Sequence, residues 1–549
     1  MGSLPTSASE IDSLERTIVD HLFVLQPSYA VALGLHEYDG RLPDFSPTST
    51  DRWVHDAEAL LARLAHVPTD ALPPSRKADA FLLSLLLESP LFDLRDVGDL
   101  ERNPMNYLGA VSLTAYLSRD YAPVPRRVDA VVRTLEQVPR LLGEGRARLR
   151  GPLPKPFVDL SLAIGGGLPA HFAEAEEFAK PAGLSGAVRA AREPAEAAVT
   201  EFLAWLNEHH LPRAVPEFAL GPKLYQKLLY VREGIVAPFE EIRRAGRADL
   251  ERNQRRLTEI AEAARRSVPE LLTDVSNGHP TAAELIPTAQ AYVEEVRRFV
   301  EERSLATVPA EARCRVEETP VYGRALSTAS MNPPGPFDTT SSEGVYYVTP
   351  VDAAWTAQQQ EEWLRSLNRS TLRNTTVHEV YPGHYLQFLH FRKATGSLAR
   401  KVYLSSSFTE GWAHYTEQLA IEQGMARDDR LGEVAQLLDA LLRNTRLLVS
   451  VGLHTDGMSL EAATEMFQRD AHMERLPAER EAIRGTFNPE YFCYTLGKLA
   501  ILNARSRFLT SKFGGRLRAF HDTLLALGCP PVGLLDAMLE GAAVAASSA

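Results

Sequence analysis

The stretch from Pro238 to Arg266 reads PFEEIRRAGRADLERNQRRLTEIAEAARR, and it indicates the class of fold that the chain adopts. Apolar side chains recur along it at intervals of three or four residues, which places them on one face of a helix while charged side chains cover the rest. This stripe contains Ile242, Ala245, Leu250, Leu257 and Ile260. Because such stripes usually pack into a core, the stretch predicts a long amphipathic helix.

The same periodicity recurs in three further segments, namely residues 51–66, 128–149 and 186–208. A different pattern follows the Pro-rich stretch 331–340, which is too rich in proline to be helical. There, residues 344–349 are mostly aromatic or β-branched, and Pro350 ends the run. That segment is the best strand candidate in the chain. We therefore expect a mainly α-helical fold with one small β element.

The length of 549 residues permits either several domains or one large helical body. A loop-like stretch, DVSNGHPT, spans residues 274–281 and marks a soft boundary. We predict an amino-terminal helical region over residues 1–275 and a second helical region over residues 276–549, which contains the metal-site motifs described below. Both regions are expected to form one compact unit.

The composition argues against two classes of protein. With 59 Lys and Arg against 71 Asp and Glu, the formal charge is −12, whereas nucleic-acid and membrane-surface binding require clustered positive charge. No segment has the roughly 20 uninterrupted apolar residues of a spanning helix. The first residues, MGSLPTSASEIDSLERTIVD, lack the pattern of a secretion signal, and only three cysteines occur. We expect a cytoplasmic protein that binds neither nucleic acid nor membranes.

The segment TLRNTTVHEVYPGHYLQFLHF, residues 371–391, contains the first chemical motif. His378 and Glu379 are adjacent, and His384 follows six residues after the first histidine. On a regular helix this spacing places the two imidazoles about 120° apart, so that they share one metal only if the helix is distorted between them. Pro382 and Gly383 lie where such a distortion costs least. The alternative is a helix end whose histidines bind nothing.

The second motif is FTEGWAHYTEQL, residues 408–419. Glu410, His414 and Glu417 are spaced so that they share one helical face. A carboxylate from a second helix completes a His, His, Glu zinc site that leaves one position open for water. The alternative is that Glu410 caps its helix and pairs with His414.

The two motifs, HEVYPGHYLQ and FTEGWAHYTE, resemble those of the bacterial domain-of-unknown-function family 885, whose members resemble zinc-dependent gluzincin peptidases. Three further blocks are similar to that family: QPSYAVALGLHEYDGRLPDFS at residues 26–46, RNTRLLVSVGLHTDGMSLEAA at 443–463 and YTLGKLAILNAR at 494–505. The resemblance therefore covers most of the chain. It implies a large multi-helix body with a deep groove and the small β element beside the metal-site helix.

The resemblance also implies one Zn²⁺ per chain and a role for each motif residue. The implied zinc ligands are His378, His384 and Glu410. Glu379 would be the general base that takes a proton from the metal-bound water as this water attacks a carbonyl. Tyr494 and His454 are candidate donors to the developing oxyanion. Their alternative role is to satisfy hydrogen bonds in the core.

Substrate-binding candidates come from two residue types. Arg443, Arg446 and Arg505 are candidates for binding a substrate carboxylate, because a guanidinium group matches it as a planar fork. Their alternative is an ion pair within the protein. The strand that contains Tyr346 and Tyr347 is a candidate for pairing with the backbone of a bound peptide, and its alternative is to cover the core.

Three positions depart from the pattern of the family. Ser450 stands where an Asp is usual, Glu490 where a Gln is expected, and His414 where an apolar residue is common. These changes leave the implied ligands and base intact but alter their surroundings, which tune metal sites.

We therefore predict a zinc-dependent hydrolase of the peptidase type, a metallopeptidase or carboxypeptidase-like enzyme, that acts on an amide of a short peptide or amino-acid conjugate. Two alternatives remain: a metal-dependent tailoring enzyme of specialised metabolism, and a non-catalytic binding protein. A site of two histidines and one carboxylate also suits manganese, cobalt or non-haem iron. The substrate, the site of cleavage along it and the oligomeric state stay open.

Overall fold

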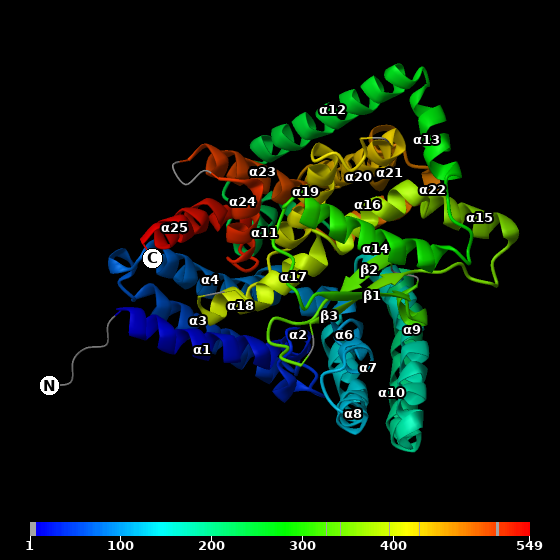
Figure 1. Cartoon of the computed structure of the whole chain (residues 1–549). Helices are drawn as coiled ribbons and strands as arrows, with labels where there is room; N and C mark the ends of the chain where they lie inside the picture. Colours follow the sequence, from blue (N-terminus) through cyan, green and yellow to red (C-terminus); the bar gives the residue numbers. More distant parts are fainter. Residues whose placement is uncertain are drawn as a thin grey trace. The chain divides into compact units, whose positions relative to one another are not determined.

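The computed structural model describes residues 7–324, 327–340, 342–394, 396–427, 429–511 and 515–548. The fold is mainly α-helical with a small three-stranded mixed sheet, as the sequence predicts (Figure 1). The chain divides into two compact units by its internal contacts. Unit 1 comprises the described residues of 1–220, 334–341 and 396–403, and unit 2 comprises those of 221–333, 342–395 and 404–549. The predicted boundary at residue 275 stays a prediction.

The named elements of unit 1, among the residues that the structure describes, are all helices. Its longer helices are α1 (Ser7–Leu25), α3 (Pro47–Ala65), α4 (Pro74–Leu91), α8 (Val124–Arg148), α9 (Lys155–Ala179) and α10 (Ser185–Trp205). Its short helices are α2 (Pro27–Ala32), α5 (Asp99–Arg102), α6 (Met105–Leu108), α7 (Thr114–Ser118) and α18 (Leu398–Val402). Helix α10 packs on both α8 and α9, and Leu135, Phe172 and Phe202 are fully buried among them. This packing forms the main core of the unit.

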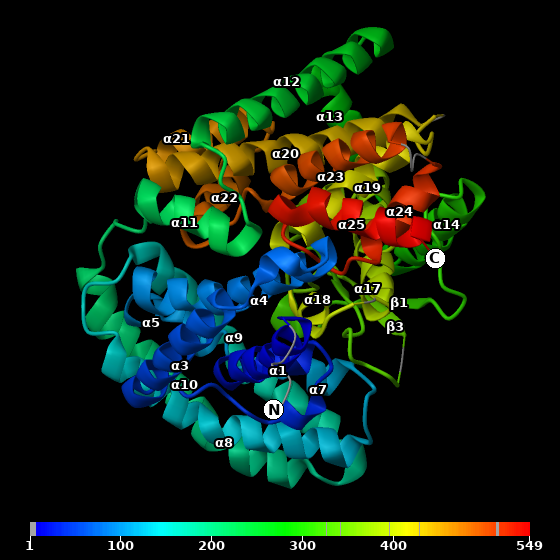
Figure 2. The ribbon, with the colours of Figure 1, turned by 90° about the vertical axis from the view of Figure 1, so that its left-hand side faces the viewer.

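Unit 2 contains the helices of both motifs. In chain order these helices are α11 (Gly221–Glu233), α12 (Phe239–Ala264), α13 (Val268–Asn277), α14 (Leu285–Glu302), α15 (Ala357–Ser366), α16 (Arg369–Glu379), α17 (His384–Arg392) and α19 (Ser406–Glu422). They are followed by α20 (Arg430–Thr455), α21 (Leu460–Asp470), α22 (Arg475–Phe487), α23 (Cys493–Thr510), α24 (Leu517–Leu525) and α25 (Leu535–Ser548). Helix α20 contacts α12, α16 and α19, and Figure 2 shows it between α12 and α19.

Helix α12 confirms the prediction made from residues 238–266. Four residues of the expected stripe are buried, but Ala245 is exposed and Gly246 occupies the packed position instead. A Cβ atom at Gly246 would lie 2.7 Å from a methyl group of Leu447 on α20. The absence of a side chain at Gly246 therefore allows α12 to approach α20 closely.

The small sheet has the strand order β1, β3, β2, from β1 (Arg313–Glu318), β2 (Ala329–Asn332) and β3 (Glu343–Val348). The predicted strand at residues 344–349 is confirmed as β3, which runs parallel to β1 and antiparallel to β2. The expectation that Tyr346 and Tyr347 pair with a bound peptide is corrected, because β3 is the central strand and both of its edges are already paired. Strand β2 contacts α16 and α17, so the sheet lies beside the helices of the first motif.

Within the described part of the chain, no helix is long and apolar enough to cross a membrane. The deep groove implied by the family resemblance stays a prediction.

Candidate metal centre

The helix of the first motif is broken between its two histidines, as their spacing predicts. His378 lies in the last turn of α16, and His384 is the first residue of α17. The turn between them brings the backbone of Gly383 against the end of α16, so that a Cβ atom at Gly383 would overlap the carbonyl oxygen of His378. The amide of Gly383 donates a hydrogen bond of 3.1 Å to the carbonyl of Val377. A glycine at this position therefore permits both imidazoles to face the same side.

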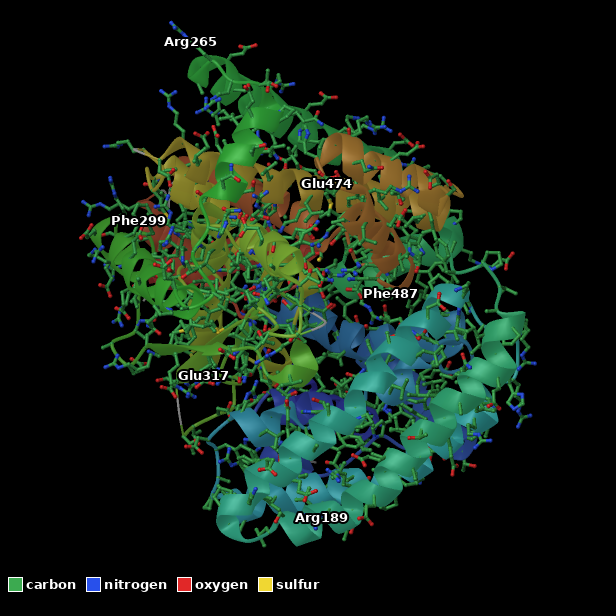
Figure 3. The ribbon with its side chains drawn as sticks, turned by 90° about the vertical axis from the view of Figure 1, so that its right-hand side faces the viewer. Arg189, Arg265, Phe299, Glu317, Glu474 and Phe487 are labelled. Atoms are coloured by element: carbon green, nitrogen blue, oxygen red, sulfur yellow. The ribbon has the colours of Figure 1, made fainter. Side chains whose placement is uncertain are left out.

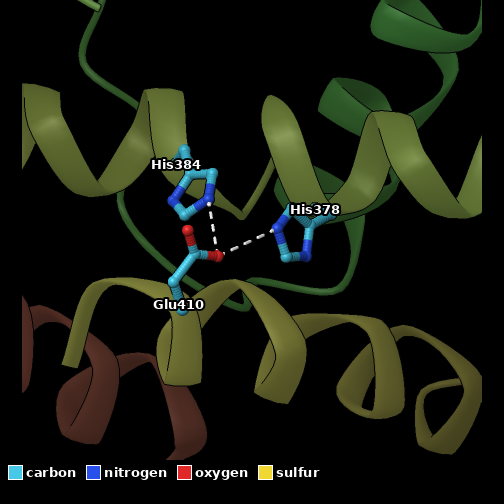
Figure 4. A group of neighbouring side chains, drawn as sticks. All are labelled: His378, His384 and Glu410. Atoms are coloured by element: carbon cyan, nitrogen blue, oxygen red, sulfur yellow. Dashed lines mark ion pairs between the residues drawn. The ribbon is translucent and has the colours of Figure 1, made fainter. Parts of the chain in front are cut away.

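The second motif forms α19, which supplies Glu410. The indole N–H of Trp412, on the same helix, donates a hydrogen bond of 2.8 Å to the carbonyl of Pro382 in the turn. Helix α19 is in turn packed directly on α23, where a Cβ atom at Gly411 would overlap the backbone of Gly497. These contacts fix Glu410 beneath the two histidines, and Figure 4 shows both rings facing its carboxylate.

The geometry of the three side chains suits a metal ion. One carboxylate oxygen of Glu410 lies 3.5 Å from Nε2 of His378 and 3.5 Å from Nε2 of His384. One ligand atom from each residue can be chosen so that all three lie within 4.8 Å of one another. Two ligands of a tetrahedral zinc ion are separated by about 3.3 Å at ordinary bond lengths. The side chains therefore stand at the spacing of ligands, and two imidazole nitrogens with one carboxylate are a donor set that zinc accepts.

A second carboxylate orients His378. Oε1 of Glu417 lies 2.6 Å from Nδ1 of His378 and accepts its proton, which leaves Nε2 as the free lone pair on the side of Glu410. The other oxygen of Glu417 accepts hydrogen bonds from Arg443 at 3.1 Å and Asn374 at 3.3 Å. Burial by itself would raise the pKa of Glu417, but Arg443 and the histidines hold this pKa well below its usual value. Glu417 is therefore an ionised, fully buried partner of a candidate ligand.

Glu379, the candidate base, directly follows His378 at the end of α16. It is partly exposed, and within the described residues its carboxylate has no hydrogen-bond partner in the protein. Loss of hydration raises its pKa, although the two candidate histidine ligands oppose that shift. A carboxylate with raised basicity and free lone pairs is suited to accepting a proton.

The two candidate oxyanion donors lie in different surroundings. Tyr494, near the start of α23, is partly exposed, and its pKa is raised by burial and by the nearby carboxylate of Glu410. His454 is buried, its Nε2 donates to the carbonyl of Gly485 at 2.9 Å, and its ring stacks on Tyr225. This is the arrangement of a core histidine. The oxyanion role of either residue stays a prediction.

The three candidate arginines each have a carboxylate partner. Arg443 pairs with Glu417, and Arg505 donates to Glu422 at 2.8 Å. Arg446 forms two hydrogen bonds of 2.8 Å to Glu481. These are the ion pairs that were the alternative to substrate binding, and the substrate-binding role stays a prediction.

The two tyrosines of β3 are buried, since Tyr346 is 0% and Tyr347 is 7% exposed. Their side chains therefore cover the core.

The three departures from the family pattern are all accommodated by local contacts. The hydroxyl of Ser450 contacts that of Tyr225 at 2.8 Å and donates to the carbonyl of Pro489. Glu490 pairs with Arg232 at 3.1 Å. His414 is fully buried, with Nδ1 3.4 Å from Glu417. Of the three, only His414 contacts the carboxylate that orients His378.

The sequence placed Glu417 on the face of Glu410 without assigning it a role. Its spacing of seven residues from Glu410 was the available signal, because two helical turns bring a side chain back to the same face. Asn374 and Asp439, which are joined by a hydrogen bond of 2.6 Å behind Glu417, carried no such signal.

The fold and the site together define a mainly helical protein with a largely buried His, His, Glu group at a broken helix. The chain belongs to the family described as bacterial protein of unknown function (DUF885), whose profile matches residues 27–539. The family description names no activity, and the likeness to gluzincin peptidases stays a prediction.

Two solved structures are similar to the chain over nearly its whole length. The first is a candidate lipoprotein of unknown function from Shewanella oneidensis, with 22% identity, a TM-score of 0.78, and coverage of 97% of this chain and 99% of that one. The second is a candidate lipoprotein from Colwellia psychrerythraea, with 19% identity, a TM-score of 0.77, and coverage of 98% and 99%. At these identities the likeness shows the fold alone. No curated protein matches the chain at a significant level.

Proposed function

We propose that this protein is a zinc-dependent hydrolase of the peptidase type that cleaves an amide of a short peptide or amino-acid conjugate. The observation that carries the proposal is the group formed by His378, His384 and Glu410, whose nitrogen and oxygen atoms stand at the separation of metal ligands. Glu379, next to the first ligand, adds an acceptor for a proton. A metal-binding group without catalysis would not require such a carboxylate.

A bound zinc ion supplies a water of lowered pKa and polarises a carbonyl oxygen. The chain supplies the remaining functions. Glu379 accepts the proton of the attacking water and returns it to the leaving nitrogen. Tyr494 donates its hydroxyl proton to the oxygen on which negative charge develops. Glu417 and the turn at Gly383 hold the imidazoles in the orientation that binding requires.

The first experiment is elemental analysis of the purified protein after dialysis against metal-free buffer and readdition of zinc. We expect about one zinc per chain, and its loss in the folded double variant His378→Ala/His384→Ala. The control is His66→Ala, which removes an exposed histidine at the end of α3 and should leave the metal content unchanged. A folded wild type that takes up no metal overturns the proposal.

Turnover is tested with Glu379→Gln, which keeps the ligands and the shape of the side chain but cannot accept a proton. We expect normal zinc content and a loss of activity of about 10²-fold or more. A panel of dipeptides and small amides, read by mass spectrometry, separates a peptidase, which cleaves many dipeptides, from a tailoring enzyme with a single small-molecule substrate. Unchanged ligand binding without any cleavage by the wild type would indicate a binding protein.

Location is a separate proposal. All three cysteines are free thiols, as expected in the reducing cytoplasm, and we infer a cytoplasmic protein. The description of both relatives as candidate lipoproteins points instead to the cell envelope. Fractionation of bacterial cells that produce the native protein decides between them, and recovery in the envelope fraction would overturn the cytoplasmic assignment.

A further inference from the structure

Helix α22 carries a guanidinium group, that of Arg484, which forms no ion pair with any of the described residues. Glu474 and Phe487, which are labelled in Figure 3, mark the two ends of this helix, and Arg484 lies in its last turn. Arg484 is partly exposed, and its guanidinium stacks over the ring of Tyr491 at 5.3 Å. Across the described residues it donates no hydrogen bond and forms no ion pair. This distinguishes it from Arg443, Arg446 and Arg505, which are all paired.

The carboxylate one turn before Arg484 on the same helix already has partners. Glu481, one turn before Arg484 on α22, accepts two hydrogen bonds from Arg446 and one of 2.7 Å from the hydroxyl of Tyr491. These bonds, together with the charges of Arg446 and Arg484, hold the pKa of Glu481 below its usual value against the effect of burial. Glu481 is thus neutralised by Arg446, and the positive charge of Arg484 remains available to a ligand.

Side-chain contacts connect Arg484 to the candidate metal centre through Tyr494. The guanidinium of Arg443 lies over the ring of Tyr494 at 5.6 Å, and one of its nitrogens is 3.4 Å from Nδ1 of His378. The guanidinium of Arg446 lies over the rings of both Tyr491 and Tyr494, at 5.0 and 5.2 Å. Because Arg484 and Arg446 both stack on Tyr491, these contacts lead continuously from the candidate ligand His378 to Arg484.

We propose that Arg484 binds the α-carboxylate of a peptide substrate, so that the protein selects peptides by their free carboxyl end and cleaves close to it. This inference rests on the proposed hydrolase function and specifies its substrate class. A guanidinium binds carboxylate through two parallel hydrogen bonds, and stacking on Tyr491 fixes its plane. Hydrolysis adds one water across the amide: a C–O bond forms, the C–N bond breaks, and the leaving nitrogen takes a proton.

The test measures binding and is therefore independent of turnover. The zinc-loaded Glu379→Gln variant is incubated with acetyl-Ala-Ala-Xaa peptides carrying a free carboxylate, with the same peptides as carboxamides, and with acetyl-Ala-Ala-Glu-amide. Retention on ultrafiltration is read by mass spectrometry. We expect at least about tenfold tighter binding of the free acids than of either amide, because only the acids offer an α-carboxylate to the guanidinium.

The same assay is repeated with two variants of Arg484. Arg484→Gln should reduce the preference for free acids over amides to about one. Arg484→Lys keeps the charge but loses the planar guanidinium, so its preference should lie between those of the wild type and Arg484→Gln. The control is Arg480→Gln, which removes an equal charge from an exposed position on the same helix and should keep the preference. Melting curves confirm that each variant is folded.

Three outcomes overturn the inference: equal binding of acids and amides, tighter binding of the Glu-amide, or an acid preference that survives Arg484→Gln. Failure to retain any peptide also counts against it. The proposed function fails in a different way, through absence of zinc or absence of cleavage by the wild type. Equal cleavage of free acids and amides by the wild type would leave the hydrolase standing and remove this role of Arg484.

Discussion

Replacing Glu417 by Gln separates the orientation of a metal ligand from its presence. The carboxylate of Glu417 accepts the Nδ1 proton of His378 at 2.6 Å and is fully buried. A glutamine of the same size leaves all three candidate ligands in place but cannot accept this proton with a full negative charge. The imidazole then has lower basicity and a less strongly fixed ring plane.

Two effects of different size follow from the contacts of Glu417. Loss of such a partner typically weakens metal binding 10- to 100-fold, which is about 1.4–2.7 kcal/mol. The folded protein also loses the 3.1 Å ion pair with Arg443, whose side chain is 12% exposed. Leaving a buried cation unpaired costs about 3–5 kcal/mol. The lower end applies here, because the nearby Asp439 also stabilises the charge of Arg443. We therefore expect a loss of about 3 kcal/mol in the free energy of unfolding.

Competition with a chromophoric chelator measures the zinc affinity, and urea unfolding of the metal-free protein measures stability. The matched control is Glu422→Gln, which removes a carboxylate from the same helix where it pairs with Arg505 and is 34% exposed. It should change the zinc affinity less than twofold. Unchanged zinc affinity in folded Glu417→Gln, with only stability reduced, would refute the orienting role and leave Glu417 as a structural ion-pair partner.

Three further predictions concern metal, pH and packing. Removal of zinc by a chelator should lower the melting temperature, and readdition should restore it, since a ligand that binds only the folded state stabilises it; calorimetry checks this. Burial raises the pKa of Glu233 to about 7 although Ser405 donates to it, so the stability that this one carboxyl contributes should be fully present below pH 4.5 and should decline as pH rises through 7. Glu233→Gln should remove up to about 3 kcal/mol of that decline in urea unfolding at pH 4.5 and 7, and an unchanged slope would contradict this. Gly411→Ala should destabilise the fold by about 2 kcal/mol or more because the new methyl group overlaps Gly497, whereas Gly143→Ala, with open space around it, should not.

The sequence predicts the helical class well, because side-chain periodicity is a local property. It found α12 to within two residues of each end, and it found β3 from its aromatic and β-branched run. It wrongly placed Ala245 on the buried face, where Gly246 lies instead, because periodicity does not show which of two neighbouring small residues contacts the partner helix. It also offered β3 as a partner for a peptide backbone, since the order of strands depends on pairing with segments that are distant in sequence.

The part of the candidate site that depends on residue spacing within one helix was predictable from the sequence. The spacing of His378 and His384 required a break, and Pro382 with Gly383 marked its position. The partners that act across helices were not predictable from spacing alone. Arg443 and Arg446 resemble substrate-binding residues in a sequence, and only the fold shows that Glu417 and Glu481 neutralise them, whereas Arg484 forms no ion pair within the part of the chain that the structure describes.

The close approach of backbones at two places explains how the three ligands are assembled before any metal is bound. At Gly383 the chain folds back against the end of α16, and at Gly411 helix α19 packs on α23 without an intervening side chain. The hydrogen bond from Trp412 to Pro382 joins these two regions. Backbone contacts of this kind are rigid compared with contacts between long side chains, so a metal would meet ligands that need little rearrangement. Weakening the packing of α19 on α23 should therefore reduce metal affinity even though no ligand is altered.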